Sequence, residues 1–378
     1  MSYSKKLLDE SKDPLSGILN QTSGRVGWTV PSNIAIIKYW GKQANQIPMN
    51  PSLSVTLDKA HTKTTVDYEI DLSLKETGIN FFFENKKSPP FEERIRKFIG
   101  SLTAYLPYLN KVNLTIHSEN SFPHSSGIAS SASAMGALAM CLCEIESEIK
   151  EQSPNDPKVP NDSTEQNDVN EFLKKASFIA RLGSGSASRS IYGKMVLWGD
   201  TPEWDNSSDE YALPIENIHK AFNGIRDSIL IVESGKKSVS SSAGHALMEN
   251  NPFAEERFRQ AGRNLVRLKR ILSEGDWPGF IEVMENEALS LHAMMMTSTP
   301  GYLLMQPATV EIIKRVRAYR EASGAHVGFT LDAGANVHIL YSAGDSKAVE
   351  QLIESDLARF CENGFHIPDG MGAGPQKL

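Results

Sequence analysis

Two segments in which apolar and polar residues alternate constrain the fold of this chain more than any other feature. Residues 62–70 and 111–117 each repeat with a period of two, as expected for β-strands that are buried on one face. Residues 91–106, between them, carry apolar side chains at spacings of three and four, which is the period of an amphipathic helix. Strands with one polar face favour antiparallel sheets, so we predict an α+β fold in which helices cover antiparallel sheets.

The second half of the chain begins after a turn-rich stretch at residues 200–210 and shows a separate series of elements. With 378 residues, of which 40% are hydrophobic, the chain exceeds one ordinary domain. We therefore predict two domains, residues 1–224 and 225–378. The elements predicted for the second domain are a strand from Asp227, helices over 258–272, 280–291 and 310–319, strands at 327–331 and 337–341, and a last helix over 346–361 before Gly364.

The charge of the chain argues against nucleic acid and membranes as partners. The formal net charge is −7, and Lys and Arg are scattered rather than gathered in a stripe. No apolar stretch has the length of a transmembrane helix, and residues 1–15 lack the apolar core of a signal peptide. We therefore expect a cytoplasmic protein, in which a few local cations hold any anionic ligand.

One loop is built almost entirely from small residues. Residues 122–136, FPHSSGIASSASAMG, connect a predicted strand to a helix predicted to begin near Ser131. Backbone N–H groups can approach a ligand closely in such a loop, and a helix start adds unpaired donors, so phosphate fits there. Hydroxyls of Ser130, Ser131 and Ser133 could add donors or a Mg²⁺ contact. A tight turn that permits close packing explains the composition equally well, and the GxxxxGK[ST] phosphate loop is absent.

Three further stretches carry groups suited to an anion or to proton transfer. Lys38 lies inside the apolar run NIAIIKYWGK (33–42), which we predict as a buried strand; either an anionic ligand compensates its charge or it reaches the edge of the sheet. Arg189 lies in GSGSASRS (183–190), as a fork for an anion or as a solvated charge. Asp332, before a glycine turn, either stabilises the turn or orients and deprotonates a hydroxyl.

The cysteines and histidines do not predict a metal site in the protein itself. Cys141 and Cys143 lie two apart within an apolar helical pattern, so they face different sides of a helix and we expect reduced thiols in the core. The nine histidines are dispersed, and neither HExxH nor CxxC occurs. Mg²⁺ carried by a nucleotide is therefore the ion to expect.

Together these stretches resemble the mevalonate diphosphate decarboxylases of the GHMP kinase superfamily. NIAIIKYWGK, PMNPSLSVTL (48–57), SGIASSASA, GSGSASRS and LDAGAN follow one another in the family's order. Loops like SGIASS occur throughout the superfamily, whereas the first, fourth and fifth motifs together are typical of the decarboxylase branch. The likeness spans residues 28–341.

The resemblance implies a two-domain GHMP kinase-like fold, with an N-terminal domain like domain 2 of ribosomal protein S5 and a ferredoxin-like C-terminal domain. It implies a homodimer that uses ATP and Mg²⁺ to convert mevalonate 5-diphosphate into isopentenyl diphosphate, ADP, phosphate and CO₂. Asp332 is implied beside the substrate hydroxyl and Arg189 on the substrate carboxylate, with Lys38 as the third catalytic residue. Implied substrate contacts are Asn33, Tyr39, Lys42, Ser184, Ser186, and Ser240 or Ser241; implied ATP contacts are Ser125, Gly127, Ala129, Ser130, Ser131 and Ser133.

Three departures from the family pattern leave alternatives open. The chain reads His124-Ser125-Ser126-Gly127 where members tend to read Thr-Ala-Ala-Gly, Pro51 where they read Ser, and Ala335 where they read Pro. The substrate could therefore be the 5-monophosphate. A related small-molecule kinase and a non-catalytic nucleotide sensor are the other two alternatives, and the match at all three catalytic positions speaks against both. Lys38 would contact either substrate phosphate or Asp332.

Overall fold

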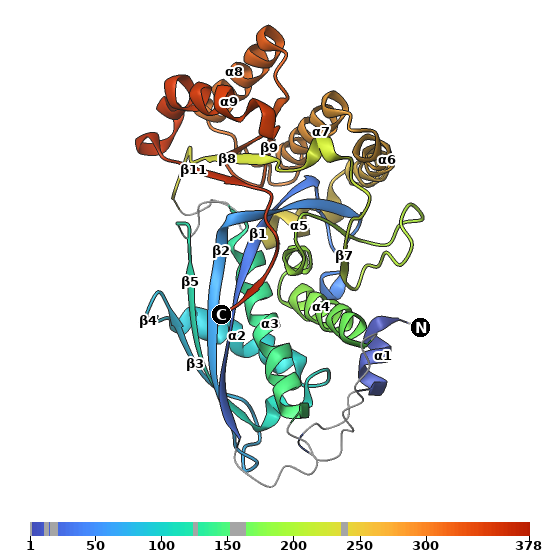
Figure 1. Ribbon diagram of the computed structural model, residues 1–378, viewed down its shortest axis with the longest axis vertical. Helices are drawn as coiled ribbons and strands as arrows, with labels where there is room; N and C mark the ends of the chain where they lie inside the picture. The colour runs from blue at the N-terminus through green and yellow to red at the C-terminus, as the bar shows by residue number, and fades with distance from the viewer. Residues whose placement is uncertain (1, 11–14, 16–21, 124–127, 152–163, 236–240) are drawn as a thin grey trace.

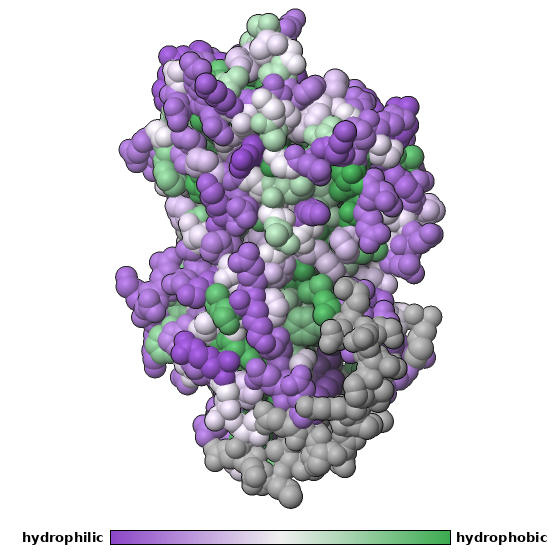
Figure 2. Space-filling view, in the orientation of Figure 1, coloured by the Kyte–Doolittle hydropathy of each residue, from purple (hydrophilic) through white to green (hydrophobic). Residues whose placement is uncertain are grey.

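The computed structural model describes the whole chain except residues 1, 11–14, 16–21, 124–127, 152–163 and 236–240. In the described part, two β-sheets lie one above the other, each covered by helices (Figure 1). No described helix is both long and apolar enough to cross a membrane. The face of the molecule seen in Figure 2 is mostly hydrophilic, with apolar residues showing only in small areas.

The larger sheet has eight strands in the order β12-β1-β2-β5-β3-β4, with β6 pairing β2 and β7. The predicted alternating segments form parts of β2 and β5, and their buried residues face the helices as expected. Every pairing is antiparallel except that of β3 with β5. The strands are β1 (Ser23–Ile37), β2 (Ser52–Ile70), β3 (Gly78–Phe83), β4 (Lys86–Lys87), β5 (Val112–Asn120), β6 (Met195–Trp198), β7 (Ala212–Pro214) and β12 (Gln376–Lys377).

Helix α3 (Ser130–Glu151) packs along β1 and β2 and forms the centre of the first core. Nearly every residue of its middle turns is buried, because the sheet lies on one side and α4 (Thr164–Gly183) on another. The free cysteines Cys141 and Cys143 lie there, which confirms the prediction of core thiols, and burial raises the pKa of both. The remaining helices of this part are α1 (Tyr3–Glu10) and α2 (Pro89–Leu102).

The smaller sheet has four antiparallel strands in the order β11-β8-β10-β9. Strands β9 (Val327–Leu331) and β10 (Val337–Tyr341) have the predicted bounds. The last predicted helix is wrong in part: α9 ends at Leu352 and continues as a π turn and then a 3₁₀ turn, so the helical period changes while apolar residues stay buried. The other elements are β8 (Arg226–Leu230), β11 (His366–Gly370), α5 (Ser241–Ala246), α6 (Ala254–Glu274), α7 (Trp277–Met296), α8 (Pro307–Ser323) and α9 (Ser346–Leu352).

The two sheets share a hydrophobic core. Ile34 of β1, in the larger sheet, packs in one cluster with Ile229 of β8, in the smaller sheet, and the cluster also contains Leu265 of α6 and Phe280 of α7. The C-terminal end of β1 is therefore fixed against α6 and α7, and that is where the site described below lies. The predicted domain division at residue 224 stays a prediction.

After β11 the chain returns to the larger sheet. The carboxylate of Asp369, in β11, accepts hydrogen bonds from the backbone N–H groups of Asp58 and Lys59 at 2.9 Å and of Ala60 at 2.8 Å, in a bend of β2. Gly372 then passes so close to β2 that a Cβ on it would lie 2.1 Å from the carbonyl oxygen of Leu57. Finally β12 pairs with β1, so segments far apart in the sequence complete one sheet.

Candidate active site

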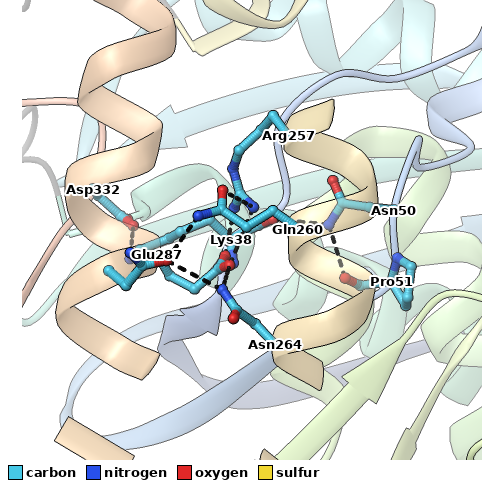
Figure 3. A network of polar contacts seen from close by, with 9 residues as sticks. Lys38, Asn50, Pro51, Arg257, Gln260, Asn264, Glu287 and Asp332 are labelled. Atoms are coloured by element: carbon cyan, nitrogen blue, oxygen red, sulfur yellow. Dashed lines mark hydrogen bonds and ion pairs between the residues drawn. The ribbon is translucent and has the colours of Figure 1, made fainter. Parts of the chain in front are cut away.

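Lys38 lies directly beyond the end of β1 and is buried. The prediction of a continuous strand through residue 42 is wrong, because β1 ends at Ile37 and the chain turns away from the sheet. The Lys38 ammonium lies 3.2 Å from Oδ1 of Asp332, and the Lys38 side chain is 2% exposed against 28% for Asp332 (Figure 3). The alternative of a lysine reaching the sheet edge is therefore excluded. The Asp332 carboxylate is partly exposed to solvent, and the Lys38 ammonium lies behind it.

The Lys38–Asp332 pair stabilises two charges that burial alone would disfavour. Burial lowers the pKa of Lys38, and the carboxylates of Asp332 and Glu287 oppose that shift. An opposite charge at 3.2 Å favours the ionised forms of both partners. Asp332 is therefore presented to solvent as a carboxylate with a fixed cation at its back.

Arg189 approaches the same carboxylate from the 3₁₀ helix Gly185–Ile191. Its guanidinium is buried, and it donates hydrogen bonds to the hydroxyls of Ser54 at 2.5 Å and Ser52 at 2.6 Å. Burial lowers the pKa of Arg189 to about 10, and the charge of Asp332 opposes this. The alternative of a solvated surface arginine is therefore excluded. Two buried cations thus face one partly exposed carboxylate, which suits an additional anion.

The turn that carries Asp332 is held at several points. The imidazole Nε2 of His292 lies 3.1 Å from the backbone oxygen of Asp332, and the N–H of Gly334 donates to the same oxygen at 2.8 Å. The hydroxyl of Thr309 donates to the carbonyl of Ala335 at 2.6 Å. The amide of Asn336 binds both the N–H and the carbonyl of Glu233. Asp332 is therefore not a mobile loop residue.

Tyr39 lies beside the 3₁₀ helix that carries Arg189, called the arginine helix below. Its ring packs between Trp198, at 4.7 Å between ring centroids, and His245, at 4.4 Å. The hydroxyl is buried and has no hydrogen-bond partner among the residues that the structure describes. Gly185 makes this approach possible, because a Cβ there would lie 2.8 Å from that hydroxyl. A buried polar atom without a partner costs free energy, so this hydroxyl suits a ligand.

The other residues predicted to contact substrate differ in where they lie. The amide of Asn33 donates to Ser190 Oγ at 2.8 Å and to the carbonyl of Ser186 at 3.2 Å, so it is joined to the arginine helix. Lys42 instead directs its ammonium to Gln46 Oε1 at 2.8 Å, and burial lowers its pKa. Ser240 lies outside the described residues, and Ser241 begins α5 with its side chain undescribed.

The predicted phosphate loop leads into the start of α3. Ala129 has a φ of 38°, a conformation that L residues rarely adopt, and α3 begins at Ser130 with no acidic residue in its first turn. The hydroxyls of Ser131 and Ser184 lie 3.4 Å apart, so the start of α3 lies beside one of the residues predicted to contact substrate. Ser133 is buried and bound to Thr62 at 2.7 Å, so it faces the sheet. Ser125 and Gly127 lie outside the described residues.

Comparison with known proteins assigns the chain to a family. Residues 30–211 match the family model described as the diphosphomevalonate decarboxylase-like N-terminal domain, and residues 228–366 match the mevalonate 5-diphosphate decarboxylase C-terminal domain. The diphosphomevalonate decarboxylase of Gibberella zeae is 30% identical over 339 residues, which cover 86% of this chain and 83% of that protein. This chain belongs to the diphosphomevalonate decarboxylase family.

Solved structures of diphosphomevalonate decarboxylases share the fold. The enzyme from Staphylococcus aureus matches with a TM-score of 0.77 at 28% identity, over 96% of this chain and 99% of that one. A protein named MDDEF, solved in complex with MVAPP, AMPPCP and magnesium, matches with a TM-score of 0.76 at 26% identity, over 94% of this chain and 99% of that one. The predicted α+β, GHMP kinase-like fold is therefore confirmed.

Sequence reasoning missed several side chains that bind Arg189, Lys38 or Asp332 in this member of the decarboxylase family. Ser52 and Ser54 bind Arg189, and a signal existed, because hydroxyls two apart in a strand share one face. Glu287 and His292 contact the backbone of Lys38 and of Asp332. Their signal was weaker: two polar residues within a mostly apolar helical pattern.

Proposed function

We propose that this protein is an ATP-dependent decarboxylase that converts mevalonate 5-diphosphate into isopentenyl diphosphate in the mevalonate pathway of isoprenoid biosynthesis. The observation that carries the proposal is the arrangement of Asp332, Lys38 and Arg189: a partly exposed carboxylate with two buried cations beside it. Family membership supplies the substrate, because an anion-holding site alone does not select one.

The chemistry requires a positioned carboxylate. A tertiary hydroxyl is a poor leaving group, so it is first phosphorylated by ATP. In our proposal Asp332 orients that hydroxyl and accepts its proton as the hydroxyl oxygen attacks the γ-phosphorus of ATP and ADP leaves. Lys38 keeps Asp332 ionised beforehand. The exposed fraction of Asp332 admits the hydroxyl, whereas the burial of Lys38 keeps its ammonium behind the carboxylate. Of the two neighbours predicted for Lys38, we therefore favour Asp332 over substrate phosphate.

The second step needs a fixed cation for the substrate carboxylate. When phosphate leaves, positive charge builds at the carbon, and the electrons of the bond to the carboxylate form the double bond as CO₂ departs. In our proposal Arg189 holds that carboxylate in line, because its guanidinium is fixed by two serine hydroxyls before substrate arrives. The hydroxyl of Tyr39 lies ready for a further polar contact.

We assign the nucleotide to the start of α3. Ser130 and Ser131, at the positive end of the helix dipole, would hold the ATP phosphates together with Mg²⁺, which neutralises phosphate charge during transfer. The fit rests on the positive φ of Ala129 at the entry to the helix and on a first helical turn without an acidic residue to repel phosphate. Ser133 has a packing role in this proposal, because its hydroxyl is engaged by Thr62.

One experiment tests the reaction and the substrate. The purified protein is incubated with Mg-ATP and, separately, mevalonate, its 5-phosphate and its 5-diphosphate, and ADP and CO₂ are measured. We expect equimolar ADP and CO₂ with the 5-diphosphate alone. CO₂ from the 5-phosphate would establish the alternative substrate, and ADP without CO₂ would establish a kinase. ADP and CO₂ absent from all three reactions would refute the proposal.

We further propose that the enzyme acts in the cytoplasm as a homodimer. Three free, buried cysteines suit a reducing compartment, and the dimer rests on the family resemblance. Light scattering of the purified protein should give twice the mass of one chain, and a single-chain mass at micromolar concentration would contradict the dimer.

A further inference from the structure

We infer that helix α7 positions both members of the Lys38–Asp332 pair, through Glu287 and His292, which bind backbone atoms of those two residues. The inference rests on the proposed function, because it concerns how the reacting carboxylate is aligned. Both side chains are buried, and each binds a backbone atom of the pair rather than a reacting atom. They are therefore positioning residues and not catalytic ones.

Glu287 holds the backbone at Lys38. Its Oε2 accepts a hydrogen bond at 2.9 Å from the N–H of Lys38, the first residue beyond β1 (Figure 3). The guanidinium of Arg257 binds both carboxylate oxygens, at 3.1 and 2.5 Å, and the amide of Asn264 donates to Oε1 at 2.6 Å. These two partners come from α6, so the carboxylate that reaches across to Lys38 is itself fixed from the side.

A buried ion pair of this kind gives little net stability. The desolvation of two charges largely offsets their attraction, and well-packed apolar residues would serve stability as well. An apolar residue at position 287 would, however, leave the N–H of Lys38 without its acceptor. What the Glu287–Arg257 pair supplies is therefore a fixed position for the backbone that carries the lysine.

His292 holds the other half of the pair. Its Nε2 lies 3.1 Å from the backbone oxygen of Asp332, so we assign the ring proton to Nε2. Burial lowers the pKa of His292 to about 4, which keeps the imidazole neutral at pH 7. A neutral donor fixes the carbonyl without placing a second positive charge beside Lys38.

Both anchors lie on one rigid element. Residues 287 and 292 are five apart in α7, a rise of about 7.5 Å along the helix axis. Glu287 binds the residue after β1, and His292 binds the turn after β9. The two residues that they bind, Lys38 and Asp332, are 294 positions apart in the sequence. Because a misplacement of about 1 Å can cost ~100-fold in rate, a helix that sets the distance between the lysine and the carboxylate acts directly on turnover.

The test compares four variants of the full-length protein. Gln at position 287 has one acceptor oxygen for the three groups that donate to Glu287, and Phe at position 292 has no donor. We therefore expect Glu287→Gln and His292→Phe each to lower kcat by at least about tenfold with the KM for ATP within about twofold, since alignment and not nucleotide binding is lost. His292→Gln, which retains an amide donor, should restore most of the rate. The matched control is Glu285→Gln: Glu285 is also buried in α7 but binds Arg317 at 2.9 Å and Arg320 at 2.6 Å, away from the site. Its kcat should stay within about twofold.

A pH profile separates positioning from mere folding. Lys38 is faced by the charges of Asp332 and Glu287, which raise its pKa, and by Arg189, which lowers it; Asp227 and His292 lie within reach of its charge. Removing the charge of Glu287 should therefore lower the pKa of Lys38 further. The alkaline fall of kcat should move to lower pH in Glu287→Gln and stay in place in Glu285→Gln.

The outcomes are distinct. Folded Glu287→Gln and His292→Phe with kcat within about twofold of wild type, or a Glu285→Gln control that loses as much rate as they do, would overturn the inference. If Glu287→Gln does not fold, the comparison of His292→Phe with His292→Gln decides: equal losses in both would overturn it. Wild-type protein that releases no CO₂ would refute the proposed function instead.

Discussion

Replacing Asp369 by alanine should destabilise the protein by about 3.5 to 5 kcal/mol. The carboxylate accepts three backbone hydrogen bonds from residues 58–60. Asp58 and Lys59 are exposed, so water can replace the acceptor for their N–H groups, and each loss should cost about 1 kcal/mol. Ala60 is buried, so its N–H is left without a partner and should cost about 1.5 to 3 kcal/mol.

Urea-induced unfolding, followed by tryptophan fluorescence and circular dichroism, measures this loss. The chain has five tryptophans, and the midpoint multiplied by the slope gives the free energy of unfolding. Asp369→Asn keeps one acceptor oxygen and should lose about half as much. The control is Asp67→Ala, because the Asp67 side chain in β2 is 45% exposed and pairs with Arg25 at 3.6 Å, so its loss should change stability by less than about 1 kcal/mol. An Asp369→Ala protein within about 0.5 kcal/mol of wild type would refute the reasoning.

Three further predictions concern the site. Asp332→Asn should lower CO₂ release by at least about 100-fold while ATP binding, measured by nucleotide fluorescence, is unchanged; undiminished release would contradict its role. Arg189→Lys loses the planar fork on Ser52 and Ser54, so kcat should fall by about 100-fold, whereas a fall of under threefold would show that any cation suffices. Burial lowers the pKa of His292 to about 4, below the ordinary value of 6.5. The unfolded chain therefore binds a proton first, so stability is complete above pH 6.5 and is lost as pH falls toward 4. His292→Gln should reduce that slope by about 1.4 kcal/mol per pH unit, and an unchanged slope in urea titrations would contradict this.

The pattern of apolar residues was enough to locate most elements. Strands at 327–331 and 337–341 have their predicted bounds, so Asp332 was correctly placed at a strand end. The end of β1 was missed because Tyr39 and Trp40 continue the apolar run, and no turn residue appears before Gly41. The period of a strand carries no information on where pairing stops.

The surroundings of the site residues could not be predicted in the same way. Arg189 was identified, but its burial depends on Ser52 and Ser54, which lie more than 130 residues away. Lys38 and Glu287 are 249 residues apart. Such contacts follow from how elements distant in the sequence pack on each other, which local periodicity does not encode. The sequence therefore identified the residues proposed to react, but not the side chains that bind and position them.

The return of the chain to its first sheet has a consequence for synthesis. On the ribosome, the edge of β1 at Trp28 and Thr29 has no partner until residues 376–377 have been made. An unpaired strand edge is a template for association with other chains. A fragment that ends at residue 224 would leave that edge unpaired permanently and would lack the hydrogen bonds between Asp369 and the backbone of β2. Adding residues 366–378 as a separate peptide should make such a fragment more soluble, because it closes the edge.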